Sequence, residues 1–129
     1  MKGLDTPVLL GILHDSPSAK DLLKGLRGEE LATTELNMFE LEVLASEGSR
    51  AEHARREAAL ARLRNRITIL PVTGEAVREA SRYLRGRAGR AGFLALIWGT
   101  LAAAGCGEWL TTQAYAPSKG PNAFKVRVV

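Results

Sequence analysis

Two acidic residues stand where a carboxylate can do chemistry, and Asp5 is the first of them. Residues 2–5 predict a short strand that ends in this acid, and residues 7–13 predict a helix that starts just after it. Open α/β folds place their ligands at the carboxyl ends of the strands, so Asp5 is a candidate ligand-binding carboxylate. The alternative is that Asp5 only caps the first helix.

The second acid is Glu40, in a helix predicted over residues 34–46. At about 100° per residue, this helix carries one apolar stripe, made of Leu36, Phe39, Val43 and Leu44. We expect the stripe to face the core, and Glu40 falls inside it. A carboxylate there is costly unless it is paired, hydrated or bound to a cation. A salt bridge to one of the chain's arginines is the alternative to a functional role.

Short strands alternate with helices along the chain. Further strands are predicted over residues 30–33, 67–72, 108–112 and 125–129. Further helices are predicted over residues 17–27, 50–65, 74–85 and 93–104. Helix starts are marked by capping side chains: Ser16, Thr33 or Thr34, Ser49 and Thr73. This alternation predicts an α/β fold, with a parallel sheet covered on both faces. The helix over 93–104 is apolar all round, so we expect it in the middle of one layer.

Composition limits the classes of protein that the chain can belong to. Its 129 residues suit one domain, and a hydrophobic fraction of 46% supports a real core. No apolar run free of charge reaches the length of a membrane span, and the N-terminus lacks a signal-peptide pattern. The single cysteine, Cys106, excludes an internal disulfide and is expected to be buried. We therefore expect a soluble cytoplasmic protein, whose net charge of +4 favours polyanions modestly.

The segments around the two acids resemble the PIN domain family. They are Leu4-Asp5-Thr6, followed by Leu9, and Thr34-Glu35-Leu36-Asn37-Met38-Phe39-Glu40-Leu41. The resemblance is closest to the VapC-like toxin ribonucleases of prokaryotic VapBC-type toxin–antitoxin pairs. It covers nearly the whole chain, because residues 92–97, 109–112 and 124–128 also fall in the expected order.

The resemblance implies a single PIN-like domain over residues 1–129, a three-layer α/β/α sandwich around a central, mainly parallel sheet of four to five strands. It implies a metal-dependent endoribonuclease, in which clustered acids bind Mg²⁺ or Mn²⁺ and the metal activates water for RNA cleavage. By position, Asp5 and Glu40 are the catalytic and metal-binding residues, and Thr6 adds a supporting hydroxyl. The expected partners are RNA, a second copy of the chain in a homodimer, and a small antitoxin protein that plugs the acidic groove, often with an arginine.

Two positions depart from the family's acidic set. Leu94 stands at the place of the third acid, and Gln113 stands where the fourth usually follows the strand that contains Thr111. Thr111 and Gln113 are therefore only supporting residues, and two carboxylates with one amide hold a hydrated Mg²⁺ weakly. Three interpretations stay open: a reduced metal site that cleaves RNA, an inactive PIN-like interaction or RNA-binding module, or an imperfect C-terminal sequence.

Basic residues supply candidate RNA contacts. Arg78, Arg82 and Arg85 share one helix face, and two more arginines, Arg87 and Arg90, extend the charge into a Gly/Arg hinge. The alternative is a solvated face that pairs with its own glutamates. The helix over residues 50–65 mixes arginines with acids, and for it we predict an ordinary exposed face.

Overall fold

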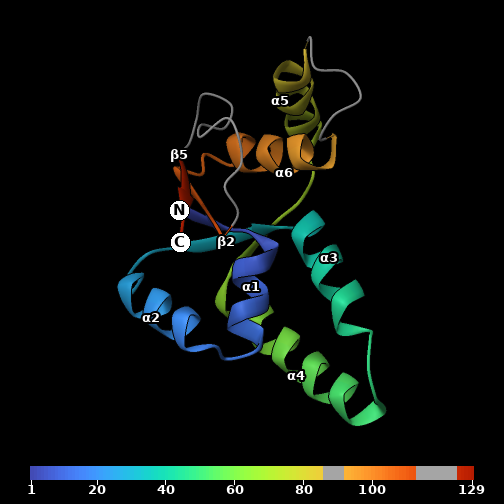
Figure 1. Cartoon of the computed structure of the whole chain (residues 1–129). Coiled ribbons are helices and arrows are strands. Elements are labelled where there is room, and N and C mark those ends of the chain that lie inside the picture. The colour runs from blue at the N-terminus through green and yellow to red at the C-terminus, as the bar shows by residue number, and fades with distance from the viewer. Residues whose placement is uncertain (86–91, 113–124) are drawn as a thin grey trace.

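The computed structural model describes residues 1–85, 92–112 and 125–129. Within them, five strands form one sheet in the order β3-β2-β1-β4-β5, and each neighbouring pair is parallel (Figure 1). The strands are β1 (Lys2–Leu4), β2 (Leu31–Thr34), β3 (Thr68–Leu70), β4 (Glu108–Thr111) and β5 (Lys125–Val128). The expected central parallel sheet is confirmed.

This strand order creates a topological switch point between β1 and β4. The chain moves outward from β1 through β2 to β3, then returns to β4 on the other side of β1. Because the strands are parallel, their carboxyl ends lie along one edge, and ligands of open α/β sheets bind at such a switch point. Asp5 directly follows β1, and Thr111 is the last residue of β4.

Six helices connect and cover these strands in the described residues: α1 (Thr6–Leu13), α2 (Pro17–Gly25), α3 (Glu35–Ala45), α4 (Arg50–Arg66), α5 (Gly74–Leu84) and α6 (Gly92–Ala103). All the predicted elements are present, and their ends move by no more than two residues. The predicted caps are also confirmed: Ser16, Thr34, Ser49 and Thr73 each accept a hydrogen bond from a backbone N–H in the first turn. Local capping chemistry therefore sets where these four helices begin.

The helices form two layers around the sheet (Figure 1). Helices α1, α2 and α4 lie against one face, α5 and α6 lie on the other, and α3 lies at the side, where it contacts α1, α4 and α6. The expected three-layer α/β/α sandwich is thus confirmed. None of the helices in the described ranges is both long and apolar enough to cross a membrane.

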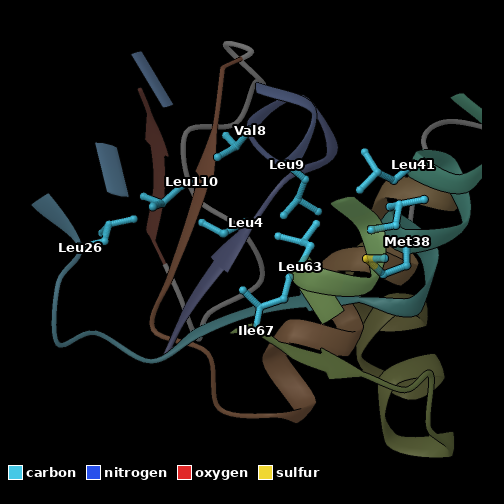
Figure 2. Packing of buried hydrophobic residues seen from close by; sticks show 10 residues of the cluster. Leu4, Val8, Leu9, Leu26, Met38, Leu41, Leu63, Ile67 and Leu110 are labelled. Atoms are coloured by element: carbon cyan, nitrogen blue, oxygen red, sulfur yellow. The ribbon is translucent and has the colours of Figure 1, made fainter. Parts of the chain in front are cut away.

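A separate hydrophobic core fills each side of the sheet. Figure 2 shows the first core, where Leu4 and Leu110 of the sheet meet α1, α3 and α4 through residues such as Leu9, Leu41 and Leu63. The second core joins Trp109 to α6. Trp109 and Leu110 belong to different cores because neighbouring side chains of a strand point to opposite faces.

Helix α6 packs in the middle of its layer, as its apolar circumference predicts. Ile97, Trp98 and Leu101 are buried in the second core. There the rings of Trp98 and Trp109 pack edge to face, with their centroids 5.6 Å apart. The outer side of α6 touches α5, and a Cβ added at Gly99 would lie 2.3 Å from the carbonyl oxygen of Ala76. Glycine is therefore needed where the two helix backbones approach. Cys106 is buried, as predicted.

The orientation of α3 differs from the prediction. Three residues of the expected core stripe are exposed, with fractions of 61% for Phe39, 48% for Val43 and 40% for Leu44. The face that enters the cores instead carries Asn37, Met38 and Leu41. The helix has two apolar stripes, and its position beside the sheet, rather than its own periodicity, decides which one is covered. Glu40 consequently lies at the boundary between the two faces, half-buried, and not inside the core.

Candidate metal centre

Asp5 is held at the carboxyl end of β1 by contacts from β4 and from the start of α1. Its backbone N–H donates to the carbonyl oxygen of Leu110 at 2.9 Å, which ties the residue to β4. Its Oδ2 accepts from Thr111 Oγ1 at 2.6 Å, and its Oδ1 accepts from the backbone N–H of Thr6 at 2.8 Å. The side chain is nearly buried, at 4% exposure. The switch point therefore holds a fixed carboxylate, with the predicted supporting residue Thr111 beside it.

Glu40 is linked to Asp5 through the hydroxyl of Thr6. Thr6 Oγ1 donates to Glu40 Oε1 at 2.9 Å. The same oxygen accepts from Asn37 Nδ2 at 3.0 Å, and Asn37 Nδ2 also lies 3.4 Å from Asp5 Oδ1. The two acids, 35 positions apart in sequence, are thus brought into one hydrogen-bonded network.

Asn37 was not among the predicted site residues. Its side chain is fully buried, and its Oδ1 accepts from Thr34 Oγ1 at 2.7 Å, while its amide group donates to Thr6 and Asp5. A sequence clue exists, because Asn37 stands three residues after the capping Thr34, on the face that also carries Leu41. A polar residue on a buried helix face needs partners, and here it orients the site.

Electrostatics at the site favour a proton or a cation. Burial raises the pKa of Asp5, and the nearby Glu40 carboxylate raises it further; the hydrogen bonds from Thr111 and from the Thr6 backbone act in the opposite direction. Among the residues that the structure describes, no arginine, lysine or histidine forms an ion pair with either acid. The alternative of a salt bridge for Glu40 is therefore wrong within these residues. The capping alternative for Asp5 is correct in part. Asp5 is the N-cap of α1, but it also accepts a hydrogen bond from Asn37, which belongs to the network that includes Glu40.

A cavity of about 310 Å³ opens in front of the two acids. Its lining combines them with an apolar wall: Asp5, Thr6, Pro7, Leu10, Glu40, Leu44, Phe93, Leu94 and Ile97. Leu94 lies in this wall, so the place of the expected third acid is inside the cavity but carries no oxygen ligand. In the described residues, no group of three or more His, Cys, Asp or Glu side chains could hold a metal ion together.

The donor chemistry fits a hydrated Mg²⁺ or Mn²⁺. Both candidate ligands are carboxylates, the oxygen donors that hard cations prefer, and Mg²⁺ commonly binds through one or two carboxylates and keeps several waters. Glu40 Oε1 is oriented by Thr6, whereas Glu40 Oε2 has no hydrogen-bond donor among the described residues. A divalent cation would replace the repulsion between the acids by attraction to both.

The predicted RNA-binding arginines that the structure describes lie apart from this cavity. Arg78 and Arg82 lie on α5 and Arg85 caps its end; none of the three lines the cavity. Arg82 forms an ion pair with Glu79, with Nη1 and Oε1 2.7 Å apart. The remaining predicted residues, Arg87, Arg90 and Gln113, lie outside the described residues.

Comparison with known proteins supports the fold. No curated protein matches the chain. A chain of VapBC2 from Rickettsia felis, bound to a DNA fragment from its promoter, is 15% identical, with 98% of both chains covered and a TM-score of 0.79. VapBC-5 from Mycobacterium tuberculosis is 23% identical, with 99% of this chain and 98% of that chain covered and a TM-score of 0.71. VapC20 from the same organism, a sarcin–ricin loop cleaving toxin, is 16% identical, with 91% and 92% covered and a TM-score of 0.62.

At these identities the solved structures show that the fold is shared. The sequence itself gives the family, because the family model of the PIN domain matches residues 3–112. That match runs from β1 to just after β4 and includes Asp5, Glu40 and Thr111. The chain belongs to the PIN domain family.

Proposed function

We propose that this protein is a metal-dependent endoribonuclease and the toxin of a VapBC-like toxin–antitoxin pair. The main support is the convergence of Asp5 and Glu40, which share the Thr6–Asn37 network and line one cavity at the switch point of the sheet. Membership of the PIN domain family supports a nuclease. A fold neighbour described as a sarcin–ricin loop cleaving toxin supports RNA as the substrate.

The protein's own residues would divide the work as follows. Asp5 and Glu40 would hold Mg²⁺ or Mn²⁺ and are the proposed catalytic residues. When bound, the metal supplies activation of water and compensation of phosphate charge. Thr6 orients the Glu40 carboxylate, while Thr111 and Asn37 orient the Asp5 carboxylate. The hydrogen bonds to Asp5 from Thr111 and from the Thr6 backbone lower its pKa and so oppose the effect of burial.

An inactive PIN-like interaction module is the second candidate. The observation that favours it is Leu94, which places an apolar side chain in the wall of the cavity where a third acid was expected. With two carboxylates rather than three or four, the bound metal would be less neutralised and less fixed in geometry. Metal binding and RNA cleavage together separate the two candidates.

The decisive experiment is cleavage of RNA with Mg²⁺ or Mn²⁺ by the wild type, Asp5→Asn and Glu40→Gln. We expect each substitution to lower the rate of cleavage by at least about 100-fold. Removing a metal ligand should reduce the rate more than removing a residue that hydrogen-bonds to that ligand, which typically costs about 10- to 100-fold. Glu42→Gln is the matched control, because Glu42 is on the same helix and pairs with Arg64 away from the cavity. Cleavage that persists in both site variants would come from a contaminant or another site.

Titration of the wild type with each metal tests the alternative. Measurable binding in the millimolar range, lost in Asp5→Asn, supports the nuclease. Complete lack of binding at those concentrations favours the interaction module.

A small antitoxin and a second copy of the chain are the proposed protein partners. Solved VapBC toxin–antitoxin complexes among the fold neighbours support the antitoxin. The exposed side chains of Phe39, Val43 and Leu44 offer an apolar surface beside the cavity for a partner. Light scattering of the purified chain, with and without the product of a neighbouring small reading frame, tests both.

A further inference from the structure

Helix α4 carries a stripe of three arginines on its exposed side. Arg55, Arg62 and Arg66 are separated by seven and four residues, which places them within about 40° of one another around the helix. All three are exposed. The residues between them on this stripe include Ala58 and Ala59, so no acid interrupts it.

The acids that made this helix look mixed in sequence contact other side chains of α4. Glu52 pairs with Arg56 at 3.9 Å. Glu57 lies 3.9 Å from His53, and Arg64 pairs with Glu42 of α3. Among the described residues, none of the three stripe arginines forms an ion pair. The three positive charges are therefore available to an external anion.

The stripe is long enough for a nucleic-acid strand. At 1.5 Å per residue, the eleven steps from Arg55 to Arg66 span about 17 Å along the helix axis. A stacked strand advances about 3.4 Å per phosphate, so the stripe faces about five nucleotides. Arginine also suits this partner, because its planar guanidinium donates to two phosphate oxygens at once.

A line of hollows joins this stripe to the two acids. The cavity at Asp5 and Glu40 shares Leu10 and Leu44 with a second hollow, which runs between α1 and α3. The second hollow shares Leu13 with a third, and the lining of the third includes Arg62 and Arg66. The eight residues of α1 make this path about 12 Å long.

One acid borders the last hollow. Asp15 lines it together with Arg62 and Arg66, and its Oδ2 lies 3.2 Å from Lys20 Nζ. This ion pair offsets the charge of Asp15, so the hollow keeps a positive balance.

We propose that Arg55, Arg62 and Arg66 of α4 bind the sugar–phosphate backbone of a single RNA strand that runs along α1 from Asp5 and Glu40. The placement of the RNA strand at Asp5 and Glu40 rests on the proposed nuclease function. Binding of RNA by the stripe can be measured without cleavage. The arginines of α5 are a separate candidate surface, in which Arg82 is already paired with Glu79.

The test is binding of a short fluorescent single-stranded RNA in EDTA, followed by anisotropy at several salt concentrations. Replacing all three stripe arginines by Gln should weaken binding by about 10- to 100-fold near 0.1 M salt and reduce the slope of log K against log salt by about 2. The triple Arg→Lys variant keeps the charges and should bind within a few-fold of the wild type. The matched control, Lys24→Gln with Arg27→Gln and Lys125→Gln, removes three exposed charges that form no ion pair among the described residues.

The outcomes separate this proposal from the proposed function. If the stripe and control variants weaken binding equally, only net charge matters and the stripe is not an RNA surface. If the stripe variant binds like the wild type, the stripe serves another partner, such as a protein, and this proposal is overturned even where the wild type cleaves RNA. If cleavage is absent but RNA binding still depends on the stripe, the nuclease fails and the RNA surface stands.

Discussion

Replacing Leu94 by Asp should convert the proposed two-carboxylate metal site into one that binds divalent cations more tightly. Leu94 is half-buried in the cavity wall that also contains Asp5 and Glu40. An aspartate there would add a third carboxylate to the same cavity. Since hard cations gain affinity from added oxygen ligands and charge, the substitution should strengthen binding of Mg²⁺ and Mn²⁺.

The same change should destabilise the protein without metal. Loss of the half-buried Leu94 side chain removes about 1 kcal/mol of hydrophobic stabilisation. Repulsion from the two existing acids adds on the order of 1–4 kcal/mol at an effective dielectric constant near 20. If the dissociation constant falls from about 10 mM to about 0.1 mM, then 10 mM metal adds about 2.7 kcal/mol, against about 0.4 kcal/mol for the wild type. That difference corresponds to a rise in Tm of about 8 °C for a chain of this size.

Thermal unfolding with and without metal measures both effects. The control is Leu94→Asn, which has nearly the same shape as the aspartate but no charge. We expect the Asp variant to have the lower Tm in EDTA and the larger rise in Tm with Mn²⁺. If the Asp and Asn variants respond equally to metal, Leu94 does not stand at a ligand position, and the placement of the metal at Asp5 and Glu40 loses its support.

Three further changes test the packing and the polar network. Gly99→Ala should destabilise the protein by about 1–3 kcal/mol in urea unfolding, because its Cβ would meet the backbone of Ala76 and push α5 away from α6; unchanged stability would show that the helices are not in close contact. Thr6→Val should cost about 1–3 kcal/mol, because the buried amide of Asn37 loses the nearer of its two acceptors, whereas Thr6→Ser should cost clearly less; equal costs would contradict the role of the hydroxyl. Since the folded-state pKa of Asp5 is raised, its contribution to stability is full below about pH 4 and is lost as the pH rises through that pKa. The Tm of the metal-free wild type relative to Asp5→Asn should therefore fall as the pH rises above about 4; a constant difference would show that the pKa is not raised.

Much of the fold could be predicted from local chemistry. Ser16, Thr34, Ser49 and Thr73 each mark a helix start in sequence because a side-chain oxygen there can accept a backbone N–H, and the structure has these four bonds. Strands that alternate with capped helices leave few alternatives to a parallel sheet. The position of Asp5 at the end of the first strand was predictable because the strand before it and the helix after it both have clear sequence signals.

The orientation of α3 was not predictable from its own sequence. Two apolar stripes surround the helix, and only the packing of α3 beside the sheet decides that Met38 and Leu41 are covered while Phe39 and Val43 are exposed. The contact between Asp5 and Thr111 joins residues 106 positions apart and depends on the neighbouring places of β1 and β4 in the sheet. The sequence pattern predicted that Glu40 lies near Asp5, but it did not predict that Glu40 is half-buried and accepts a hydrogen bond from Thr6.

Asn37 and Leu94 together explain how this site can fold with its acids close together. Each further carboxylate in a partly buried cavity adds repulsion that the folded protein must overcome without metal. Here the cavity holds two acids, an apolar side chain at Leu94 and a network in which neutral donors, Thr6, Asn37 and Thr111, hydrogen-bond the carboxylates. Such a site should tolerate the absence of metal better than a larger acidic cluster would, and the proposed metal would bind more weakly for the same reason. If the proposed metal site is correct, the reduced acidic set therefore exchanges metal affinity for stability of the metal-free fold.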